Sequence, residues 1–376
     1  MNSRKYHIII GSKDYFNSKL PVFDENDDVR SFLELVILSD ECKRQGRKFD
    51  DWADILVLKN DNYHGITEQA HDRVGAIIDE VTEDNADIYI HNPPMVLLSY
   101  IENAKKQYDD VELTIEKEKY STLKDSMNFV DNMKSISKNI VGQNNAIAET
   151  SKSMWYLTKI NRKKPYVIML YGSSSIGKTE LVREISNNFF DGKLLEKHLS
   201  MFKNNTYSDY FFGEKPNRRS LGYELLERES NLIFLDELDK CPEHFYSAFY
   251  TLFDNVIFKD SSYEVDTSGL LIVLTSNYQS KKEMQKMLGL PIYYRIDKFI
   301  HFEDFDGQTI YDITMKEIES RYEEYKDIFT PQQIYAKVSV LIQAQGENAR
   351  TIKYKVQEVI EDLLFQDIQN KFNNVH

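Results

Sequence analysis

The feature that most constrains the fold is an eight-residue stretch, Gly172 to Thr179, which reads G-S-S-S-I-G-K-T. A strand-like apolar run, Pro165 to Tyr171, precedes it, and apolar residues at helical spacing follow it. A glycine-rich loop between the end of a strand and the start of a helix presents backbone N–H groups and the positive helix end to an anion. The sequence therefore predicts a phosphate-binding loop on a Rossmann-like α/β sheet.

The residue types in this loop suit the phosphates of a nucleotide. Gly172 and Gly177 allow backbone conformations and a close approach that a Cβ would obstruct. We expect the Lys178 ammonium to reach the β and γ phosphates, and the Thr179 hydroxyl to ligate Mg²⁺. The residues assigned to phosphate binding are Gly172, Ser173, Ser174, Ser175, Ile176, Gly177, Lys178 and Thr179.

Two carboxylates end a second apolar run, residues 231–235. Asp236 is placed to hold Mg²⁺ through water, and Glu237 to orient and activate the attacking water. A third apolar run, residues 270–275, leads to Asn277, a polar tip suited to sensing a γ-phosphate or that water. A buried strand with a solvated acidic end is the structural alternative for the two carboxylates. Together with the loop upstream, the pattern favours nucleotide hydrolysis.

The order and spacing of these motifs resemble the AAA+ ATPases, and within them the C-terminal ATPase module of the Clp unfoldases and disaggregases, with torsin-like relatives. The resemblance extends from about residue 139 to the C-terminus. It rests on Ile140-Val141-Gly142-Gln143, on Gly172 to Glu180 (Walker A), on Leu235 to Pro242 (Walker B), on Leu274 to Asn277, on Tyr294 to Lys298 and on Asn348 to Ile352. The implied fold is a P-loop NTPase with a Rossmann-like parallel sheet and a helical lid.

The resemblance also implies roles for further residues. Ile140 and Val141 would pack on adenine, and Glu180 would complete the phosphate loop. Arg295 resembles an arginine finger supplied to a neighbouring subunit, and Arg350 resembles a lid residue that contacts the same nucleotide. A guanidinium stabilises charge that develops on the transferred γ-phosphoryl group. Surface ion pairing is the alternative for both arginines. The implied cofactors are ATP and Mg²⁺, and the implied assembly is a homo-oligomeric ring, a hexamer.

One segment departs from the Clp pattern. Clp modules carry an aromatic residue flanked by glycines in a pore loop that grips polypeptide. The corresponding segment here, residues 207–222, is shorter and has Arg218 and Arg219 where the gripping tip belongs. We expect its aromatic cluster, Tyr210 to Phe212, to pack rather than grip. The two arginines are expected to form either a solvated tip or a contact for an acidic partner, and processive threading is not expected.

Ahead of the motifs, strands and helices alternate, which predicts a small α/β domain over residues 1–115 with a largely parallel sheet. Strands are expected at residues 6–10, 55–58 and 87–90, and helices at residues 29–37, 74–81 and after Pro93-Pro94. The histidines of this domain lack metal-ligand spacing, and target choice is its expected task. A helical connector over residues 116–138, a large nucleotide-binding domain over residues 139–304 and a helical lid over residues 305–376 complete the predicted organisation.

Composition narrows the expected partners. The formal net charge of −14 repels phosphate backbones, so nucleic acid is not an expected partner. A nucleic-acid motor stays open through the basic residues Arg162, Lys163, Lys164, Arg218 and Arg219. The two cysteines, Cys42 and Cys241, indicate a reducing setting, and no apolar run approaches the ~20 residues that span a bilayer. A cytoplasmic location without an export signal or a membrane partner is expected.

Two hypotheses of function remain. The first is an ATP-hydrolysing ring that remodels or unfolds protein partners in the manner of a chaperone. The second is an ATP-dependent switch or scaffold that controls a separately encoded effector, for example in bacterial defence, without threading. The client or effector is not indicated by any motif.

Overall fold

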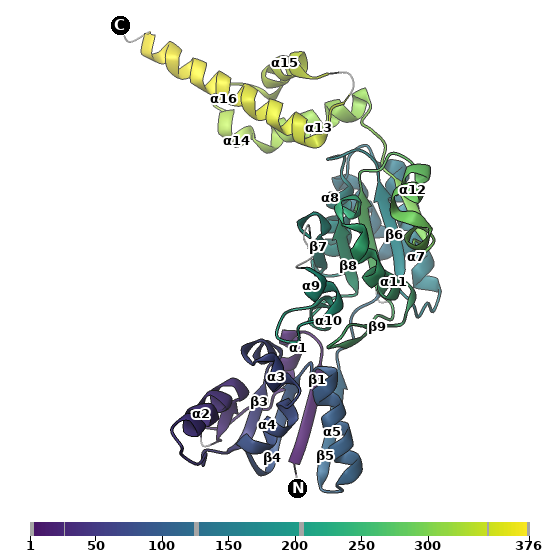
Figure 1. Ribbon diagram of the computed structural model, residues 1–376. Helices are drawn as coiled ribbons and strands as arrows, with labels where there is room; N and C mark the ends of the chain where they lie inside the picture. The colour runs from purple at the N-terminus through teal and green to yellow at the C-terminus, as the bar shows by residue number, and fades with distance from the viewer. Residues whose placement is uncertain (1–3, 26, 124–127, 203–206, 344–345, 374–376) are drawn as a thin grey trace.

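The computed structural model describes residues 4–25, 27–123, 128–202, 207–343 and 346–373. Figure 1 shows three parts in series: an N-terminal α/β part at one end, a central α/β part that carries the glycine-rich loop, and a helical part at the C-terminal end. Residues 124–127 of the predicted connector, and residues 344–345 and 374–376 of the predicted lid, lie outside the described residues.

The central part is built on a five-stranded parallel sheet. Its strand order is β12-β6-β11-β8-β7, so the strand before the glycine-rich loop, β6, lies inside the sheet. Parallel strands bring their carboxyl ends to one edge, which is where α/β sheets place ligands. The strands are β6 (Tyr166–Tyr171), β7 (Leu195–His198), β8 (Leu232–Asp236), β11 (Leu271–Ser276) and β12 (Lys298–His301).

Helices cover both faces of the central sheet. One face, which includes Ile168 and Phe234, packs against α6 (Phe129–Asn139), α7 (Asn144–Lys159) and α8 (Lys178–Phe189). The opposite face packs against α9 (Ser208–Phe212), α10 (Leu221–Leu226), α11 (Tyr246–Asp254) and α12 (Lys281–Tyr293). A small antiparallel pair, β9 (Ile257–Lys259) and β10 (Glu264–Asp266), extends from this side. Because both faces are covered, the strands read as continuous apolar runs, as in the sequence.

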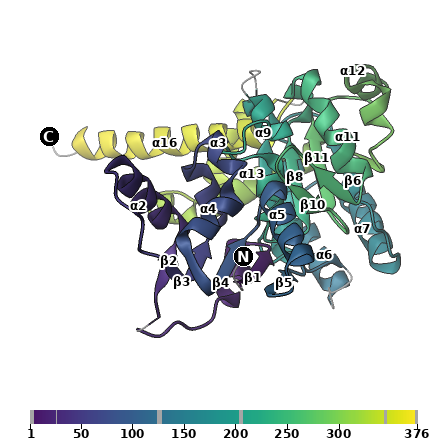
Figure 2. The same ribbon diagram turned by 60° about the horizontal axis from the view of Figure 1, so that its bottom comes forward.

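The N-terminal part holds a second five-stranded parallel sheet with the order β2-β3-β4-β1-β5. Figure 2 shows one face of this sheet covered by α4 and α5. The strands are β1 (Arg4–Ile10), β2 (Val29–Ser31), β3 (Ala53–Leu58), β4 (Thr82–His91) and β5 (Val111–Lys117). The helices are α1 (Lys13–Lys19), α2 (Phe32–Arg44), α3 (Glu68–His71), α4 (Val74–Val81) and α5 (Met95–Gln107).

The predicted parallel sheet of the N-terminal part is confirmed, with two corrections. Val29 lies in β2, paired with Ile55, and the helix begins only at Phe32. The β-branched side chain of Val29 fits a strand beside β3 better than the first turn of a helix. The sequence reading also missed β5, which pairs with β1 from Val111 to Lys117.

The C-terminal part is helical and has its own small core. It contains α13 (Gly307–Ser320), α14 (Tyr322–Tyr325), α15 (Pro331–Leu341) and α16 (Ala349–Asn373). Ile318, Val338 and Val356, one from each of the longer helices, are fully buried together. Among the described residues, no helix is both long and apolar enough to cross a membrane.

Candidate nucleotide site

Two glycines shape the loop between β6 and α8. The φ of Gly172 is 137°, and a Cβ there would lie 2.4 Å from the backbone oxygen of Phe302. Gly177 has a φ of 105° and stands at the N-terminus of α8. Since L side chains rarely adopt such angles, both positions require glycine, as the sequence predicted. The loop therefore approaches β12 closely and opens directly onto the helix start.

The side chain of Lys178 folds back across this loop and is held there by hydrogen bonds to the loop backbone. Its Nζ donates to the carbonyl oxygens of Gly172 and Ser173 at 2.7 and 2.6 Å, and lies 3.3 Å from Asn277 Oδ1. Burial lowers the pKa of Lys178 to about 8, although the carboxylates of Asp239 and Asp236 act in the opposite direction. The ammonium is thereby positioned over the loop and next to the polar end of β11.

The two predicted carboxylates lie at the end of β8, Asp236 as its last residue and Glu237 directly after it, and both residues are bonded to Thr275 of β11. The hydroxyl of Thr275 donates to Asp236 Oδ1, and Thr275 Oγ1 accepts from the Glu237 N–H at 2.9 Å. Glu237 has a φ of 59°, an angle that costs a non-glycine residue and that the Thr275 contact helps to hold. The Asn277 N–H donates to Asp239 Oδ1 at 3.2 Å. Thr275 thus fixes the carboxylate of Asp236 and the backbone of Glu237.

These groups line one cavity of about 500 Å³, which we call the P-loop cavity. Its lining consists of Ser174, Ser175, Gly177, Lys178, Thr179, Glu180, Arg183, Asp236, Glu237, Thr275, Asn277, Ala349, Arg350 and Lys353. Ala349 and Arg350 come from the start of α16, and the Ala349 N–H donates to the Ser175 oxygen at 3.0 Å. The helical C-terminal part therefore touches the glycine-rich loop.

Several predicted residues lie outside this lining. Ile176 is 2% exposed and sits under the loop, with Gly172 and Ser173 also outside the lining. Ile140 is buried, and its segment packs behind the loop because the Gln143 amide donates to the oxygens of Ile176 and Glu303 at 3.2 and 2.9 Å. Val141, next to Ile140, is outside the lining as well.

Arg295 also lies away from the P-loop cavity. Its Nε is 2.7 Å from Asp254 Oδ2, its Nη1 donates to the Pro291 oxygen at 2.7 Å, and its guanidinium lies 4.6 Å from the ring centre of Tyr250. Within one chain, Arg295 is therefore an ion-pair partner on the surface of the central part.

Sequence reasoning missed some residues near the site. His198 ends β7 beside Asp236, and its Nδ1 lies 3.2 Å from Asp236 Oδ2. The strand β7 carries only four residues of mixed polarity, so no pattern indicated it. Lys353 lies three residues after Arg350, a spacing that places both on one helix face and could have been noticed. Thr275 lies within the Leu274 to Asn277 motif, but in that motif only Asn277 was assigned a functional role from the sequence.

The segment expected at a pore tip is packed into the central part. Phe211 is 2% exposed, and its ring centre lies 4.7 Å from that of Phe245. Arg218 Nη1 pairs with Asp209 in the same segment at 3.2 Å. Arg219 Nη2 pairs with Asp61 of the N-terminal part at 2.8 Å. Both arginines are thus ion-paired while their side chains remain exposed, at 59% for Arg218 and 61% for Arg219, and the acidic contact of Arg219 lies within its own chain.

Comparisons with known proteins agree with this geometry. A family model described as "AAA domain (Cdc48 subfamily)" matches residues 163–374. The human mitochondrial disaggregase is 26% identical over 173 residues, covering 41% of this chain and 24% of that protein. The chaperone protein ClpB of Tropheryma whipplei is 22% identical over 275 residues, covering 64% of this chain and 39% of that protein. The chain thus spans well under half the length of these relatives.

Proposed function

Since the chain belongs to the AAA domain family (Cdc48 subfamily), we propose that it binds ATP with Mg²⁺ in the P-loop cavity and that hydrolysis drives the remodelling of protein partners. As a member it is an AAA+ ATPase that resembles the Clp proteins. The observation that carries the proposal is the convergence of loop, carboxylates, Asn277 and Arg350 on one cavity. A cavity of this volume suits a ligand of nucleotide size.

The residues at the cavity fit ATP with Mg²⁺. The hydroxyl of Thr179 and the carboxylate of Asp236 offer the oxygen ligands that Mg²⁺ prefers, and both line the cavity. We assign Mg²⁺ binding to these two residues, partly through water. When bound, Mg²⁺ neutralises charge on the β and γ phosphates. Gly172 to Glu180 would hold the phosphates, with the Lys178 ammonium as their counter-charge, and Ile140 and Val141 would approach adenine from behind the loop.

The remaining groups are assigned to hydrolysis. Glu237 orients and activates the attacking water, and Asn277, 3.3 Å from Lys178 Nζ, positions that water or senses the γ-phosphate. Arg350 contacts the nucleotide from α16, so that movement of the helical part follows the nucleotide state. We keep the proposed division into an N-terminal domain (residues 1–115), a connector (116–138), a nucleotide-binding domain (139–304) and a lid (305–376).

Arg295 is proposed to complete the site of a neighbouring subunit. Its place outside the P-loop cavity of its own chain is consistent with a role across a subunit boundary. A guanidinium supplied in this way makes hydrolysis depend on assembly. We therefore propose a homo-oligomeric ring, a hexamer, with a protein client, and the two free cysteines support a reducing, cytoplasmic location.

A second function, an ATP-dependent switch that controls an effector without threading, is favoured by the segment at residues 207–222. Its central aromatic residue, Phe211, is buried in the core, and Arg219 is paired within the chain. A nucleic-acid motor is less favoured, because Arg162 pairs with Asp297 at 2.8 Å and Lys164 with Asp254 at 3.7 Å.

Hydrolysis is tested by Glu237→Gln in the full chain. We expect ATP binding close to that of the parent and loss of phosphate release, because the variant keeps the cavity but lacks the base. Glu229→Gln, which alters an exposed carboxylate paired with Lys193, is the matched control and should hydrolyse ATP normally. Equal loss of ATP affinity and turnover in Glu237→Gln would show that the role of Glu237 is misassigned.

The shared site is tested by mixing inactive variants. Arg295→Ala subunits mixed with Glu237→Gln subunits should form some interfaces with both groups intact, so ATPase activity should partly return. Light scattering verifies that the two variants co-assemble. Co-assembly without recovery of activity would rule out the trans role of Arg295.

Remodelling and switching are separated by a tagged substrate. ATP-dependent unfolding of a fluorescent protein fused to an unstructured tag supports remodelling. Assembly with slow or trigger-dependent hydrolysis, and no unfolding, supports the switch.

A further inference from the structure

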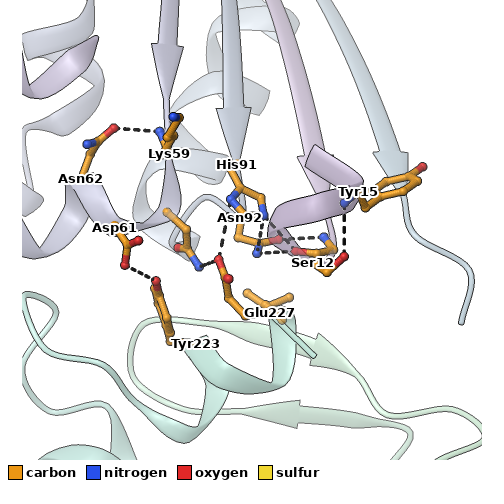
Figure 3. A network of polar contacts seen from close by, with 12 residues as sticks. Ser12, Tyr15, Lys59, Asp61, Asn62, His91, Asn92, Tyr223 and Glu227 are labelled. Carbon is orange, nitrogen blue, oxygen red and sulfur yellow. Dashed lines mark hydrogen bonds and ion pairs between the residues drawn. The ribbon is translucent and has the colours of Figure 1, made fainter. Parts of the chain in front are cut away.

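The carboxyl edge of the N-terminal sheet faces the central part of the same chain (Figures 1 and 3). Asp61 Oδ1 accepts hydrogen bonds from the Tyr223 hydroxyl and from Arg219 Nη2, each at 2.8 Å. The Asn60 amide donates to Glu227 Oε1 at 2.9 Å, and His91 Nδ1 lies 3.6 Å from the same oxygen. We call this set of contacts the α10 latch; it consists of Asn60, Asp61 and His91 of the N-terminal part and Arg219, Tyr223 and Glu227 in and beside α10.

Three further contacts widen this boundary. The Met95 N–H, at the start of α5, donates to the Ser262 oxygen between β9 and β10 at 2.8 Å. The Arg228 guanidinium lies 4.3 Å from the ring centre of Tyr120, whose hydroxyl donates to the Leu226 oxygen at 3.4 Å. Contacts of this polar kind are typical of boundaries between parts that move relative to one another.

The helix α10 also connects to the P-loop cavity. Residues 227–231 join it directly to β8, which ends at Asp236. On its other side, Glu224 pairs with Lys197 of β7 at 2.7 Å. The next residue of β7, His198, has its Nδ1 3.2 Å from Asp236 Oδ2. One short helix therefore contacts the N-terminal part and the two strands that carry Asp236 and its histidine neighbour.

The contact between α10 and the N-terminal part covers the carboxyl edge of the N-terminal sheet. This is the edge at which parallel α/β sheets usually bind their ligands. Asn60, two residues after β3, and His91, the last residue of β4, are each 1% exposed, and both contact Glu227 of the central part. Whatever binds this edge must displace α10, so binding and docking exclude one another. A ligand that favours one of two such states shifts the equilibrium between them.

We infer that the N-terminal part is a regulatory module that docks on α10 through the latch and undocks when nucleotide binds. This inference rests on the proposed nucleotide site. Its direction follows from Asp236: a cation held by this carboxylate competes with His198 for Asp236 Oδ2. Loss of that contact loosens β7, and with it the Lys197–Glu224 pair that supports α10. Coupling between two sites is reciprocal, so opening the latch must in turn tighten nucleotide binding.

Two adjacent arginines provide a matched test. Arg219 and Arg218 are similarly exposed, at 61% and 59%, but only Arg219 crosses to the N-terminal part. In full-length protein without nucleotide, Arg219→Ala should raise hydrogen exchange at residues 59–63 and 221–227, whereas Arg218→Ala should not. A latch that stays closed in Arg219→Ala and in Asp61→Asn with Tyr223→Phe would overturn the docking role.

The coupling is tested with a slowly hydrolysed ATP analogue and Mg²⁺. In the parent, the analogue should raise hydrogen exchange at residues 59–63. Arg219→Ala should bind the analogue about fivefold more tightly than the parent, at the lower end of usual allosteric couplings, and Arg218→Ala should match the parent. Normal binding with unchanged exchange and equal affinities would overturn the coupling alone. Absence of binding in the parent would refute the proposed function together with the coupling.

Discussion

Two parallel sheets in this chain are built alike and end differently. β1 and β6 both lie inside five-stranded sheets, and each runs into a glycine with a positive φ, 155° at Gly11 and 137° at Gly172. After Gly172 the chain forms the loop that lines the P-loop cavity. After Gly11, Ser12 caps the short α1 at once, and its hydroxyl accepts from the Tyr15 N–H at 3.2 Å.

The difference teaches that architecture alone does not give a sheet edge its chemistry. At the N-terminal edge the amides that could meet an anion are already used, because the Gly11 N–H donates to Asn92 Oδ1 at 2.9 Å and the Ser12 N–H to Glu118 Oε2 at 2.6 Å. In the central sheet a longer loop places its residues around a cavity instead. Loop length and local side-chain acceptors decide which edge can hold phosphate.

The largest effect is expected on ATP affinity, from a comparison of Lys178 after the β6 loop with Lys13 after β1. Lys178→Ala should weaken ATP binding by about 100-fold or more, because charge-assisted contacts to phosphate are lost. Lys13→Ala, the matched change after β1, should change ATP affinity by less than tenfold, because Lys13 lies at the other edge. Calorimetric titration of both variants measures this. Comparable losses of affinity would mean that the two edges are not as different as their loops indicate.

The next effect concerns the glycines themselves. A Cβ at Gly172 would meet the Phe302 backbone oxygen, whereas a Cβ at Gly11 would meet the side chain of Glu118 at 2.5 Å. A backbone atom held in a sheet moves less readily than a side chain, and both angles are strained for alanine. Gly172→Ala should destabilise its part by about 3 kcal/mol and Gly11→Ala by about 2 kcal/mol.

Hydrogen exchange, read separately for the N-terminal and central parts, measures both losses of stability. A larger loss at Gly11 would show that β5 and Glu118 are held more rigidly than β12. That outcome would reverse the expected order of the two losses of stability.

The central site could be predicted from sequence because its information is local. Gly172 to Thr179 and the Asp236–Glu237 pair each occupy a few consecutive residues between apolar runs, and a parallel sheet then brings the ends of β6, β8 and β11 to one edge. The AAA+ fold class predicted from these motifs is confirmed by the family match over residues 163–374.

The rest depended on contacts between distant residues, which no spacing reveals. Asp61 and Arg219 are separated by 158 positions, and His198 reaches Asp236 only because β7 pairs with β8. The seven residues of β5 read VELTIEK and are exposed over their second half, so no strand was predicted there, and the connector was expected to begin at residue 116. The fold of each part could be predicted from the periodicity of apolar residues. The contacts between the parts could not, because they are made by charged residues of a kind that is common on any protein surface.

A third effect should appear when the pH falls. Burial lowers the pKa of His91 to about 4; Asp61, Glu227 and Lys13 are the charged groups near it. Because an unfolded histidine has a pKa of about 6.5, the unfolded chain binds more protons between these values. Stability of the N-terminal part should therefore fall as the pH falls from 6.5 to 4, by at most about 3 kcal/mol.

Glu227 opposes this slope in part, since burial raises the pKa of its carboxyl group and favours the docked state at low pH. Thermal unfolding at pH 7 and pH 5 measures the net effect. His91→Gln should remove the slope, and His301→Gln, an exposed residue at the end of β12, should leave it in place. An unchanged slope in His91→Gln would assign the pH dependence to other groups.

The smallest effect compares two threonines, one at each sheet. Thr275 is 2% exposed and holds both Asp236 and the Glu237 N–H, whereas the hydroxyl of the exposed Thr114 lies 3.1 Å from His7 Nδ1 and donates to the Tyr6 oxygen at 3.4 Å. Thr275→Val keeps the side-chain shape but removes the hydroxyl and its two hydrogen bonds, so it should lower kcat about tenfold, while KM changes little. Thr114→Val should leave kcat unchanged and alter stability by less than about 0.5 kcal/mol. Steady-state ATPase kinetics and thermal unfolding of both variants measure these effects. A rise in KM with unchanged kcat in Thr275→Val would mean that Thr275 supports nucleotide binding rather than the position of Glu237, and the distinction drawn between the two edges would then rest on the phosphate loop alone.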